Sequence, residues 1–154
     1  MKSKSDGISY TPTRFGELIY LLKKNNKKYL NDRLSDYNLT LVQGICLLAI
    51  DENENITQKE LADLLNITKS GITKSVNNLQ KDSFIIKERS QDDARQFVLR
   101  LTEKGEKIIP LLYEIKSEWE NKLGLDELGD EFMDSLKILA YKSIALNSQT
   151  DDEK

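Results

Sequence analysis

The stretch 56–79 constrains the fold more than any other part of the chain, because it is typical of two short helices joined by a tight turn. Its sequence, ITQKELADLLNITKSGITKSVNNL, places Leu61 and Leu65 on one face of a first helix. Ile72 and Val76 fall on one face of a second helix, which we expect over 69–81. Two amphipathic helices at this spacing predict a helix-turn-helix.

Local signals mark where these two helices begin and where the turn lies. Thr57 is followed by Glu60 at the spacing of a capping box, and Thr68 is placed to cap the second helix. Asn66 stands between them, and asparagine tolerates the left-handed conformation that a sharp turn between helices requires. The sequence therefore predicts both helix starts and the turn.

The second helix has an outward face suited to DNA. If its apolar residues face inward, helical geometry turns polar residues outward and leaves Thr73 and Asn78 at the edges. The outward residues are Ser70, Lys74, Asn77 and Lys81. This face has donors for base edges, cations for phosphate and no acid. A solvated surface helix packed on a neighbour is the alternative interpretation.

Composition limits the remaining possibilities. A chain of 154 residues with net charge −3 most naturally forms one domain. The charge is uneven, since 56–105 carries nine basic against seven acidic residues, or +2, while the rest of the chain carries −5. Local sign is what a nucleic acid senses. Three of the five arginines, Arg89, Arg95 and Arg100, lie within twelve residues.

Enzymatic and membrane roles are disfavoured. The chain has no histidine and one cysteine, which removes histidine-based metal sites, catalytic triads and an intramolecular disulfide. Asp92 and Asp93 fit a solvated turn better than a catalytic carboxylate pair. The longest apolar run, about 44–50, is far too short to span a membrane, and the start of the chain resembles no signal peptide. We expect a cytoplasmic protein without cofactor or metal.

Helices are expected before the helix-turn-helix. Residues 13–34 have helical apolar spacing with an interruption at Asn25 and Asn26. Thr40 and Gln43 form a further capping box that opens a nearly all-apolar helix through residue 50, which we place at the centre of the core, and 51–55 is expected to be an acidic loop.

After the helix-turn-helix the apolar period changes from helical to alternating. Ile85 and Ile86 begin a β-branched run, SQDDARQ forms a polar tip, and Phe97 begins a second alternating run. This predicts a hairpin over 84–101. A hairpin after a helix-turn-helix is a wing, so 40–101 is expected to be a winged helix-turn-helix.

Long terminal helices complete the expected fold, which is mainly α with one small β-hairpin. Helices over about 13–37 and 102–146, the latter in two segments, carry more apolar surface than one small domain can cover. We expect this surface to form a homodimer. The residues assigned to dimerisation are Phe15, Leu18, Leu22, Trp119, Leu136, Leu139 and Ile144.

The wing carries a pattern that goes beyond hairpin chemistry. Over 93–105 the chain has D-x-R-x-x-x-L-x-L-T-x-x-G, which resembles the MarR family of bacterial transcription regulators. Leu39-Thr40 with Gln43, and Leu61-Ala62 with Leu65, are similar to the same family at corresponding places. The resemblance covers about 13–146. The wing pattern is fairly specific, whereas the helix-turn-helix alone is shared with many regulators.

This resemblance implies a dimeric winged-helix protein, usually a repressor, that binds a pseudo-palindromic operator in double-stranded DNA. Such proteins often release the operator when a small, commonly phenolic, ligand binds between the dimerisation and DNA-binding parts, so a small aromatic effector is an implied partner. By position, Arg95 would enter the minor groove and Asp93 would hold it in place, while Ser70, Thr73, Lys74 and Asn77 would face bases. Gln58, Lys69 and Arg89 complete the residues assigned to DNA binding.

Two positions depart from the family. The family usually has glycine just after the recognition helix, where this chain has Ser83, which must adopt a less comfortable backbone or end the helix differently. Redox-sensing members carry a reactive cysteine in the N-terminal helix, whereas Cys46 lies in an apolar run and is expected to be a buried, inert core residue.

Some alternatives stay open at the level of sequence. A winged-helix module that binds protein instead of DNA would suit the acidic total charge, and it would be favoured if Lys74 or Arg95 were buried in an internal ion pair. Aromatic residues are expected mainly in the core, although they would also suit a ligand cavity: Tyr20, Tyr29, Tyr37 and Trp119. Sequence does not name the operator, the regulated genes, the effector or the direction of regulation.

Overall fold

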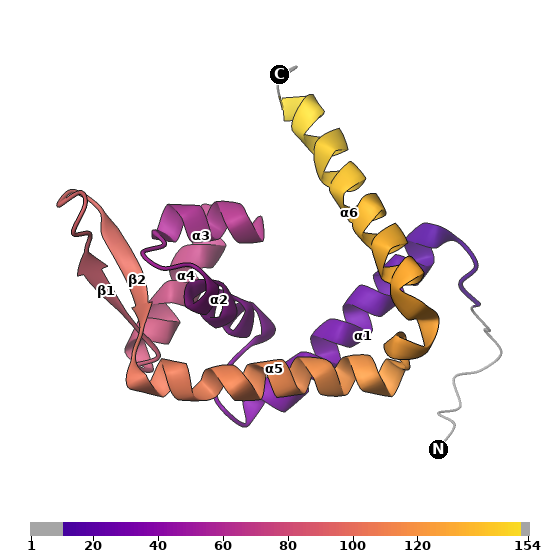
Figure 1. Ribbon diagram of the computed structural model, residues 1–154, viewed down its shortest axis with the longest axis horizontal. Helices are drawn as coiled ribbons and strands as arrows, with labels where there is room; N and C mark the ends of the chain where they lie inside the picture. Colours follow the sequence, from indigo (N-terminus) through magenta and orange to yellow (C-terminus); the bar gives the residue numbers. More distant parts are fainter. Residues whose placement is uncertain (1–10, 152–154) are drawn as a thin grey trace. The chain divides into compact units, whose positions relative to one another are not determined.

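The protein is described by a computed structural model over residues 11–151, and it is predominantly helical with one small hairpin, as expected (Figure 1). The elements follow in the order α1 (Phe15–Ser35), α2 (Leu41–Glu52), α3 (Gln58–Leu65), α4 (Lys69–Lys81), β1 (Ile85–Arg89), β2 (Phe97–Leu101), α5 (Glu103–Leu123), the short 3-10 helix η1 (Leu125–Leu128) and α6 (Gly129–Asp151). In this range no helix is both long and apolar enough to cross a membrane.

The chain divides into two compact units, Met1–Ile115 and Lys116–Lys154, and the boundary falls inside α5. The first unit holds α1 to α4, the hairpin and the start of α5. The second holds the end of α5, η1 and α6. The winged helix-turn-helix lies wholly within the first unit.

Helix α1 is continuous, as expected of the long helix over 13–34, and the interruption of its apolar spacing at Asn25 and Asn26 does not end it. The amide of Asn25 donates to the Leu21 carbonyl at 2.8 Å, which satisfies the side chain along the helix without breaking it. At the other end of α1, Asn31 accepts a hydrogen bond from the backbone N–H of Leu41 at 2.7 Å. This bond ties α1 to the start of α2.

Helix α2 is the centre of the first unit. The reciprocal bonds between Thr40 and Gln43 form the predicted capping box. Cys46 and Leu47 are completely buried, as expected for a central helix. The helix continues to Glu52, two residues beyond the predicted end, so the loop starts at Asn53 and is shorter and less acidic than expected.

The helix-turn-helix forms as its caps predict. Thr57 and Glu60 form the capping box of α3, and the hydroxyl of Thr68 accepts from the Gly71 N–H at the start of α4. Asn66 has φ 51° and ψ 46°, the left-handed conformation expected of it. Helix α4 buries its predicted inner face of Ile72, Val76 and Leu79, and it also buries Ser75, which was not predicted.

The hairpin pairs β1 with β2 in antiparallel register, from Ile85 opposite Leu101 to Arg89 opposite Phe97. A third segment lies along β2, because the Leu99 N–H donates to the Ile56 carbonyl at 2.9 Å and Thr57 forms an isolated bridge with Val98. The wing is therefore attached to the start of α3.

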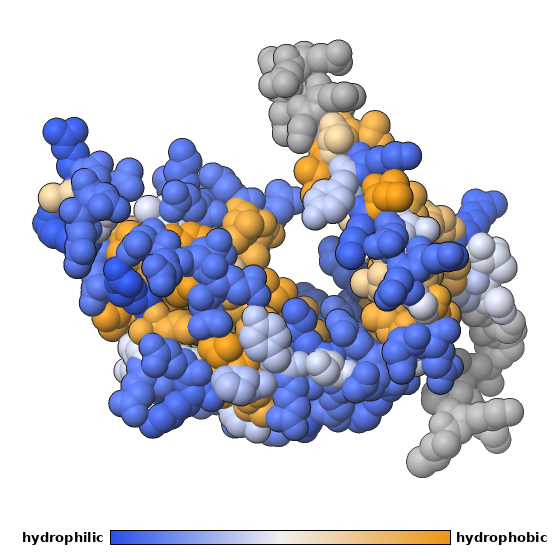
Figure 2. All heavy atoms as spheres, viewed as in Figure 1, coloured by the Kyte–Doolittle hydropathy of each residue, from blue (hydrophilic) through white to orange (hydrophobic). Residues whose placement is uncertain are grey.

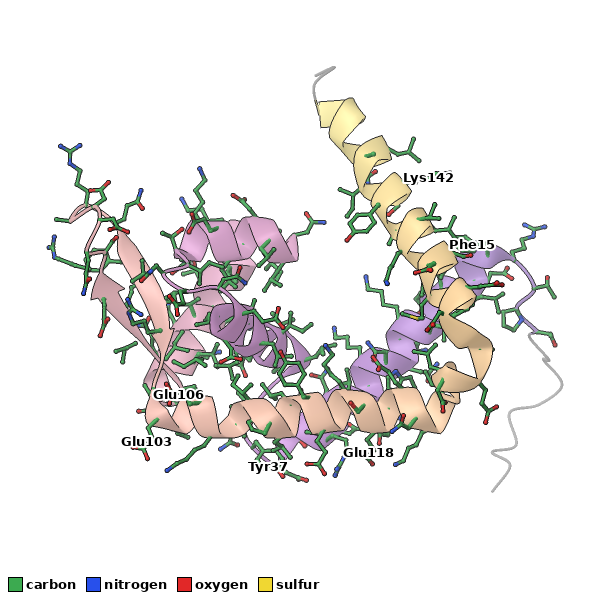
Figure 3. The ribbon with its side chains drawn as sticks, in the orientation of Figure 1. Phe15, Tyr37, Glu103, Glu106, Glu118 and Lys142 are labelled. Atoms are coloured by element: carbon green, nitrogen blue, oxygen red, sulfur yellow. The ribbon has the colours of Figure 1, made fainter. Side chains whose placement is uncertain are left out.

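A compact joint connects the end of α4, the start of the wing and the first turn of α5. Ser83 adopts φ 61°, so of the two outcomes expected where the family has glycine, the structure has the less comfortable backbone. The Thr102 hydroxyl donates to the Ser83 carbonyl at 2.6 Å, and the Thr102 N–H donates to the Phe84 carbonyl at 3.0 Å. A Cβ on Gly105 would overlap the Phe84 carbonyl oxygen. Figure 3 shows Glu103 on this turn of α5, at the base of the wing.

Candidate nucleic-acid interface

The outward face of α4 forms an open, shallow groove without an acidic residue. Its lining residues are Thr68, Lys69, Ser70, Thr73, Lys74, Asn77 and Asn78. Five of these are residues that the sequence assigns to DNA binding, namely Lys69, Ser70, Thr73, Lys74 and Asn77. The face therefore presents hydroxyls, amides and ammonium groups, which match base edges and phosphates.

Sequence reasoning left two of these residues out of the DNA-binding set. Thr68 was assigned only to capping, and Asn78 only to the edge of the outward face. Asn78 lies one helical turn after Lys74, so the i, i+4 spacing that selects neighbours on a helix was the signal that would have included it.

Thr73 is held in place by two hydrogen bonds. Its hydroxyl donates to the Lys69 carbonyl at 2.8 Å and accepts from the Gln58 amide at 3.0 Å. Gln58 begins α3, so this contact joins the two helices of the motif at the edge of the groove. Since the hydroxyl proton and one lone pair are occupied, the methyl group and the second lone pair of Thr73 remain available to a base.

Lys74 and Asn77 are exposed on α4. Over residues 11–151, the side chains of Lys74 and Arg95 form neither an ion pair nor a hydrogen bond. Burial of either cation in an internal pair would have favoured a protein-binding module. Their exposure removes that reason to prefer the protein-binding alternative.

Arg95 lies at the wing tip, where Asp93 holds its backbone. The Asp93 carboxylate accepts from the Arg95 backbone N–H at 2.9 Å, and the Gln96 N–H donates to the Asp93 carbonyl at 2.9 Å. The carboxylate therefore shapes the turn that carries Arg95 and does not grip its guanidinium. Ser90 supports the same turn by accepting the Asp92 and Asp93 N–H groups through its hydroxyl.

Arg89 is engaged inside the wing. Its Nη1 donates to the Ala94 carbonyl at 2.7 Å, and its guanidinium carbon lies 5.3 Å from the centre of the Phe97 ring. The sequence assigns Arg89 to DNA binding, but these contacts commit its guanidinium to the hairpin. Its effect on DNA would then act through the shape of the wing.

Cys46 is buried as predicted. Its side chain is completely inaccessible, and burial raises the pKa of the thiol to about 11. At neutral pH the sulfur is therefore a thiol and not the nucleophilic thiolate.

The four aromatic residues expected in the core are not buried there. Tyr20 and Tyr37 are exposed, while Tyr29 and Trp119 are only partly buried. The core of the first unit is instead aliphatic, with Leu47, Leu61, Ile72, Leu79, Ile85, Leu99 and Ile115 among its fully buried side chains. Apart from Phe84, which is buried, aliphatic residues thus supply the packing that aromatic residues were expected to supply.

The residues assigned to dimerisation lie largely at the surface. In α1, Phe15, Leu18 and Leu22 are 64%, 45% and 52% exposed, and Phe15 lies near the start of the helix (Figure 3). In the second unit, Leu139 and Ile144 of α6 are exposed, whereas Leu136 and Trp119 are intermediate. Figure 2 shows hydrophobic side chains at the surface of α6. Each unit therefore exposes an apolar helix face.

These features define a winged helix-turn-helix of the type found in DNA-binding regulators. A family model described as MarR family matches residues 37–96. The chain is 30% identical over 122 residues to the HTH-type transcriptional regulator BilQ of Clostridioides difficile (strain CD3). The aligned region covers 79% of this chain and 82% of BilQ. The HTH-type transcriptional regulator SarZ of Staphylococcus aureus (strain MRSA252) is 29% identical over 119 residues, 77% of this chain and 80% of SarZ.

Solved structures agree with this assignment. A MarR transcriptional regulator from Methanosarcina mazei Go1 is similar with a TM-score of 0.78 and 26% identity, over 85% of this chain and 96% of that one. The S. aureus MepR–DNA complex shares the fold, with a TM-score of 0.76 and 21% identity, over 86% and 95% of the two chains. The chain belongs to the MarR family. It is a transcriptional regulator with a DNA-binding winged helix, and this family does not consist of enzymes.

Proposed function

We propose that the protein is a dimeric repressor that binds a pseudo-palindromic operator and is released from it by a small aromatic effector. The observation that carries the DNA-reading part is the acid-free groove on α4, with Lys74 and Asn77 exposed in it. Helix α4 would lie in the major groove, and Arg95 would enter the adjacent minor groove.

The proposed roles follow from the position of each side chain. Lys74, Asn77 and Ser70 project from α4 and would contact base edges or phosphates, while Thr73 would present its methyl group. Lys69 opens α4, where a cation beside the first-turn amides suits a phosphate. Gln58 would act by holding Thr73, Asp93 by shaping the wing turn, and Arg89 by supporting the hairpin.

The dimer would form through the helices over about 13–37 and 102–146. The exposed apolar face of α1, which includes Phe15, Leu18 and Leu22, is the kind of surface that marks a protein interface. A symmetric pair would present two α4 helices, which matches a palindromic site with half-sites about one turn of DNA, ~34 Å, or a multiple of it apart. Sedimentation at micromolar concentration tests this, and a folded monomer would contradict it.

Repression and effector release rest on the family resemblance. A repressor bound over a promoter blocks transcription, and a ligand that prefers the unbound state releases it by that difference in affinity. Run-off transcription from a promoter that contains the selected operator tests the direction of regulation. Titration with phenolic carboxylates tests release, and activation of transcription by the protein would contradict the repressor role.

Selection of binding sites from random or genomic DNA with the purified protein is the decisive experiment. Enrichment of one palindromic sequence supports the proposal and gives the operator. If no sequence is enriched at low or moderate salt, and the protein instead captures a protein partner through the same groove, the winged-helix interaction module becomes the better interpretation.

A further inference from the structure

Arg100 differs from Arg95 because its side chain is already bound within the protein. Its Nη2 donates to Oδ1 of Asn55 at 2.6 Å, and its Nε lies 2.9 Å from Oε2 of Glu88. The Nε is shielded from solvent and has no aligned acceptor among the described residues, so its contact with Glu88 is a charge interaction. One guanidinium therefore joins β2 to β1 and to the loop before α3.

Asn55 lies where the wing is attached to the helix-turn-helix. It adopts φ 60°, and it directly precedes Ile56, whose carbonyl accepts from the Leu99 N–H of β2. The next residue, Thr57, pairs with Val98 and caps α3. The Arg100–Asn55 bond therefore reinforces two main-chain contacts between the wing and the start of α3.

The same path reaches the recognition helix. Gln58, the first residue of α3, donates to Thr73 of α4 at 3.0 Å. Contacts thus run from the wing through Asn55 and the start of α3 to the groove on α4. DNA is stiff, so a helix in the major groove and an arginine in the adjacent minor groove can engage together only if the distance between them is held nearly constant.

We propose that Arg100 is a positioning residue, which fixes the wing relative to α4 through Asn55 and Glu88 and makes no contact with DNA. This inference rests on the proposed roles of α4 and Arg95 in reading the operator. Although the Arg100 Nε is shielded, the Arg100 and Glu88 side chains as a whole are 39% and 48% exposed, and ion pairs between side chains this exposed contribute little to stability. On this proposal, the pair therefore contributes mainly to the position of the wing relative to α4, and little to the stability of the fold.

The test compares Arg100→Gln with Arg95→Gln, which removes the same charge from the same hairpin. Affinity of the full-length protein for its selected operator is measured over a series of salt concentrations. Arg100→Gln should weaken binding by about tenfold and leave the slope of log affinity against log salt unchanged. That slope is negative, and Arg95→Gln should make it shallower by about 0.9 for each protomer, because one phosphate contact is lost. A shallower slope for Arg100→Gln would mean that Arg100 contacts phosphate, and would overturn the inference.

Two further variants approach Arg100 from its partners. Glu88→Gln removes a negative charge beside a polyanion, so charge alone predicts tighter binding, whereas loss of positioning predicts weaker binding. Asn55→Gly removes the acceptor and suits the positive φ of this residue, so it introduces no backbone strain. Both should weaken binding with the salt slope unchanged. Tighter binding by Glu88→Gln would contradict the proposal.

Hydrogen exchange in the absence of DNA separates this inference from the proposed function. The Leu99 amide, which donates to Ile56, reports directly on attachment of the wing. Its exchange should be several-fold faster in Arg100→Gln and unchanged in Arg95→Gln, whether or not an operator is found. Unchanged exchange in Arg100→Gln would show that Arg100 does not hold the wing, even if the wild-type protein binds DNA.

Discussion

The recognition helix and the wing use their polar side chains in opposite ways. On α4, the exposed residues Lys74 and Asn77 line an open groove, and the Lys74 side chain makes no polar contact within the described chain. In the wing, Arg89 is bound to Ala94, and Arg100 is bound to Asn55 and Glu88. Of the three wing arginines, Arg95 alone has a side chain without an internal polar contact among the described residues.

The difference follows from how each element is stabilised. A helix satisfies its backbone groups internally, and α4 buries Ile72, Val76 and Leu79 on one side, so its other side is left for recognition. A two-stranded hairpin is marginally stable at best and needs further contacts. The wing obtains these contacts from side chains, which are then not available to DNA.

Gly105→Ala should have the largest effect, because it disrupts the joint on which both elements depend. The added methyl group would overlap the Phe84 carbonyl, which also accepts from the Thr102 N–H. Backbone cannot move aside as a flexible side chain can, so we expect a loss of about 3 kcal/mol in the free energy of unfolding. Urea denaturation measures this loss.

Gly16→Ala is a matched control for Gly105→Ala, since a Cβ at Gly16 meets nothing within 4 Å in another α-helix. It should leave stability equal or slightly higher, by up to ~1 kcal/mol, because alanine favours a helix. Equal stability of the two variants would show that the joint can relax around an added methyl group.

Lys74→Ala and Asn77→Ala test the recognition helix. Each should weaken specific binding by about 1–3 kcal/mol, because a side chain that contacts a base edge or a phosphate is lost. Fluorescence anisotropy with the selected operator measures the loss, and thermal melting should be unchanged because both side chains are exposed. Lys107→Ala removes an exposed lysine that pairs with Glu103 away from the groove, and it should change affinity far less. Equal losses for Lys74 and Lys107 would indicate an effect of net charge alone.

The same contrast explains which features the sequence predicts. The capping boxes at Thr40 and Thr57 and the left-handed Asn66 were predicted, because each depends on residues within a few positions of it. The positive φ of Ser83 is one of the two outcomes that the family resemblance implied. The composition of the outward face of α4 was also predicted, because helical spacing fixes it. Local rules therefore suffice where the backbone fixes the direction of the side chains.

Features that depend on distant residues were not predicted. The division of labour among the wing arginines depends on Ala94 and on Asn55, which lies 45 positions before Arg100. Hydropathy likewise did not show that the core would consist of aliphatic residues and Phe84, and not of the tyrosines and Trp119.

Arg95→Ala and Asp93→Ala test the wing tip, where we expect a smaller effect. Arg95→Ala should lower affinity and flatten the salt dependence by about 0.9 per protomer, with a further loss at operators with A·T-rich flanks. Asp93→Ala removes an acid beside DNA, yet it should also weaken binding because the carboxylate shapes the turn through the Arg95 N–H. Salt titrations on two operators measure both. Tighter binding by Asp93→Ala at every salt concentration would show that the carboxylate merely repels DNA.

Ser83→Gly should have the smallest effect, and it tests how the wing is held relative to α4. Ser83 has φ 61°, which is costly for a residue with a Cβ, while glycine loses more chain entropy on folding. The first term should prevail, with a gain of about 0.5 kcal/mol in the free energy of unfolding. Asn66→Gly, at φ 51°, is the matched control and should gain nothing, because asparagine already tolerates this conformation.

Operator affinity of Ser83→Gly then separates two ways of fixing the wing. If the turn at Ser83 sets the angle between α4 and the wing, a more flexible glycine should loosen the wing and weaken binding. If the contacts of Thr102 and Arg100 set this angle, affinity should be unchanged. Thr102 is bonded to the carbonyls of Ser83 and Phe84, and Arg100 is bonded to Asn55, and these contacts do not need a serine side chain at residue 83. We expect unchanged affinity together with the gain in stability. Weaker binding would mean that the backbone conformation at residue 83, and not the side chains of the wing, determines how the protein meets DNA.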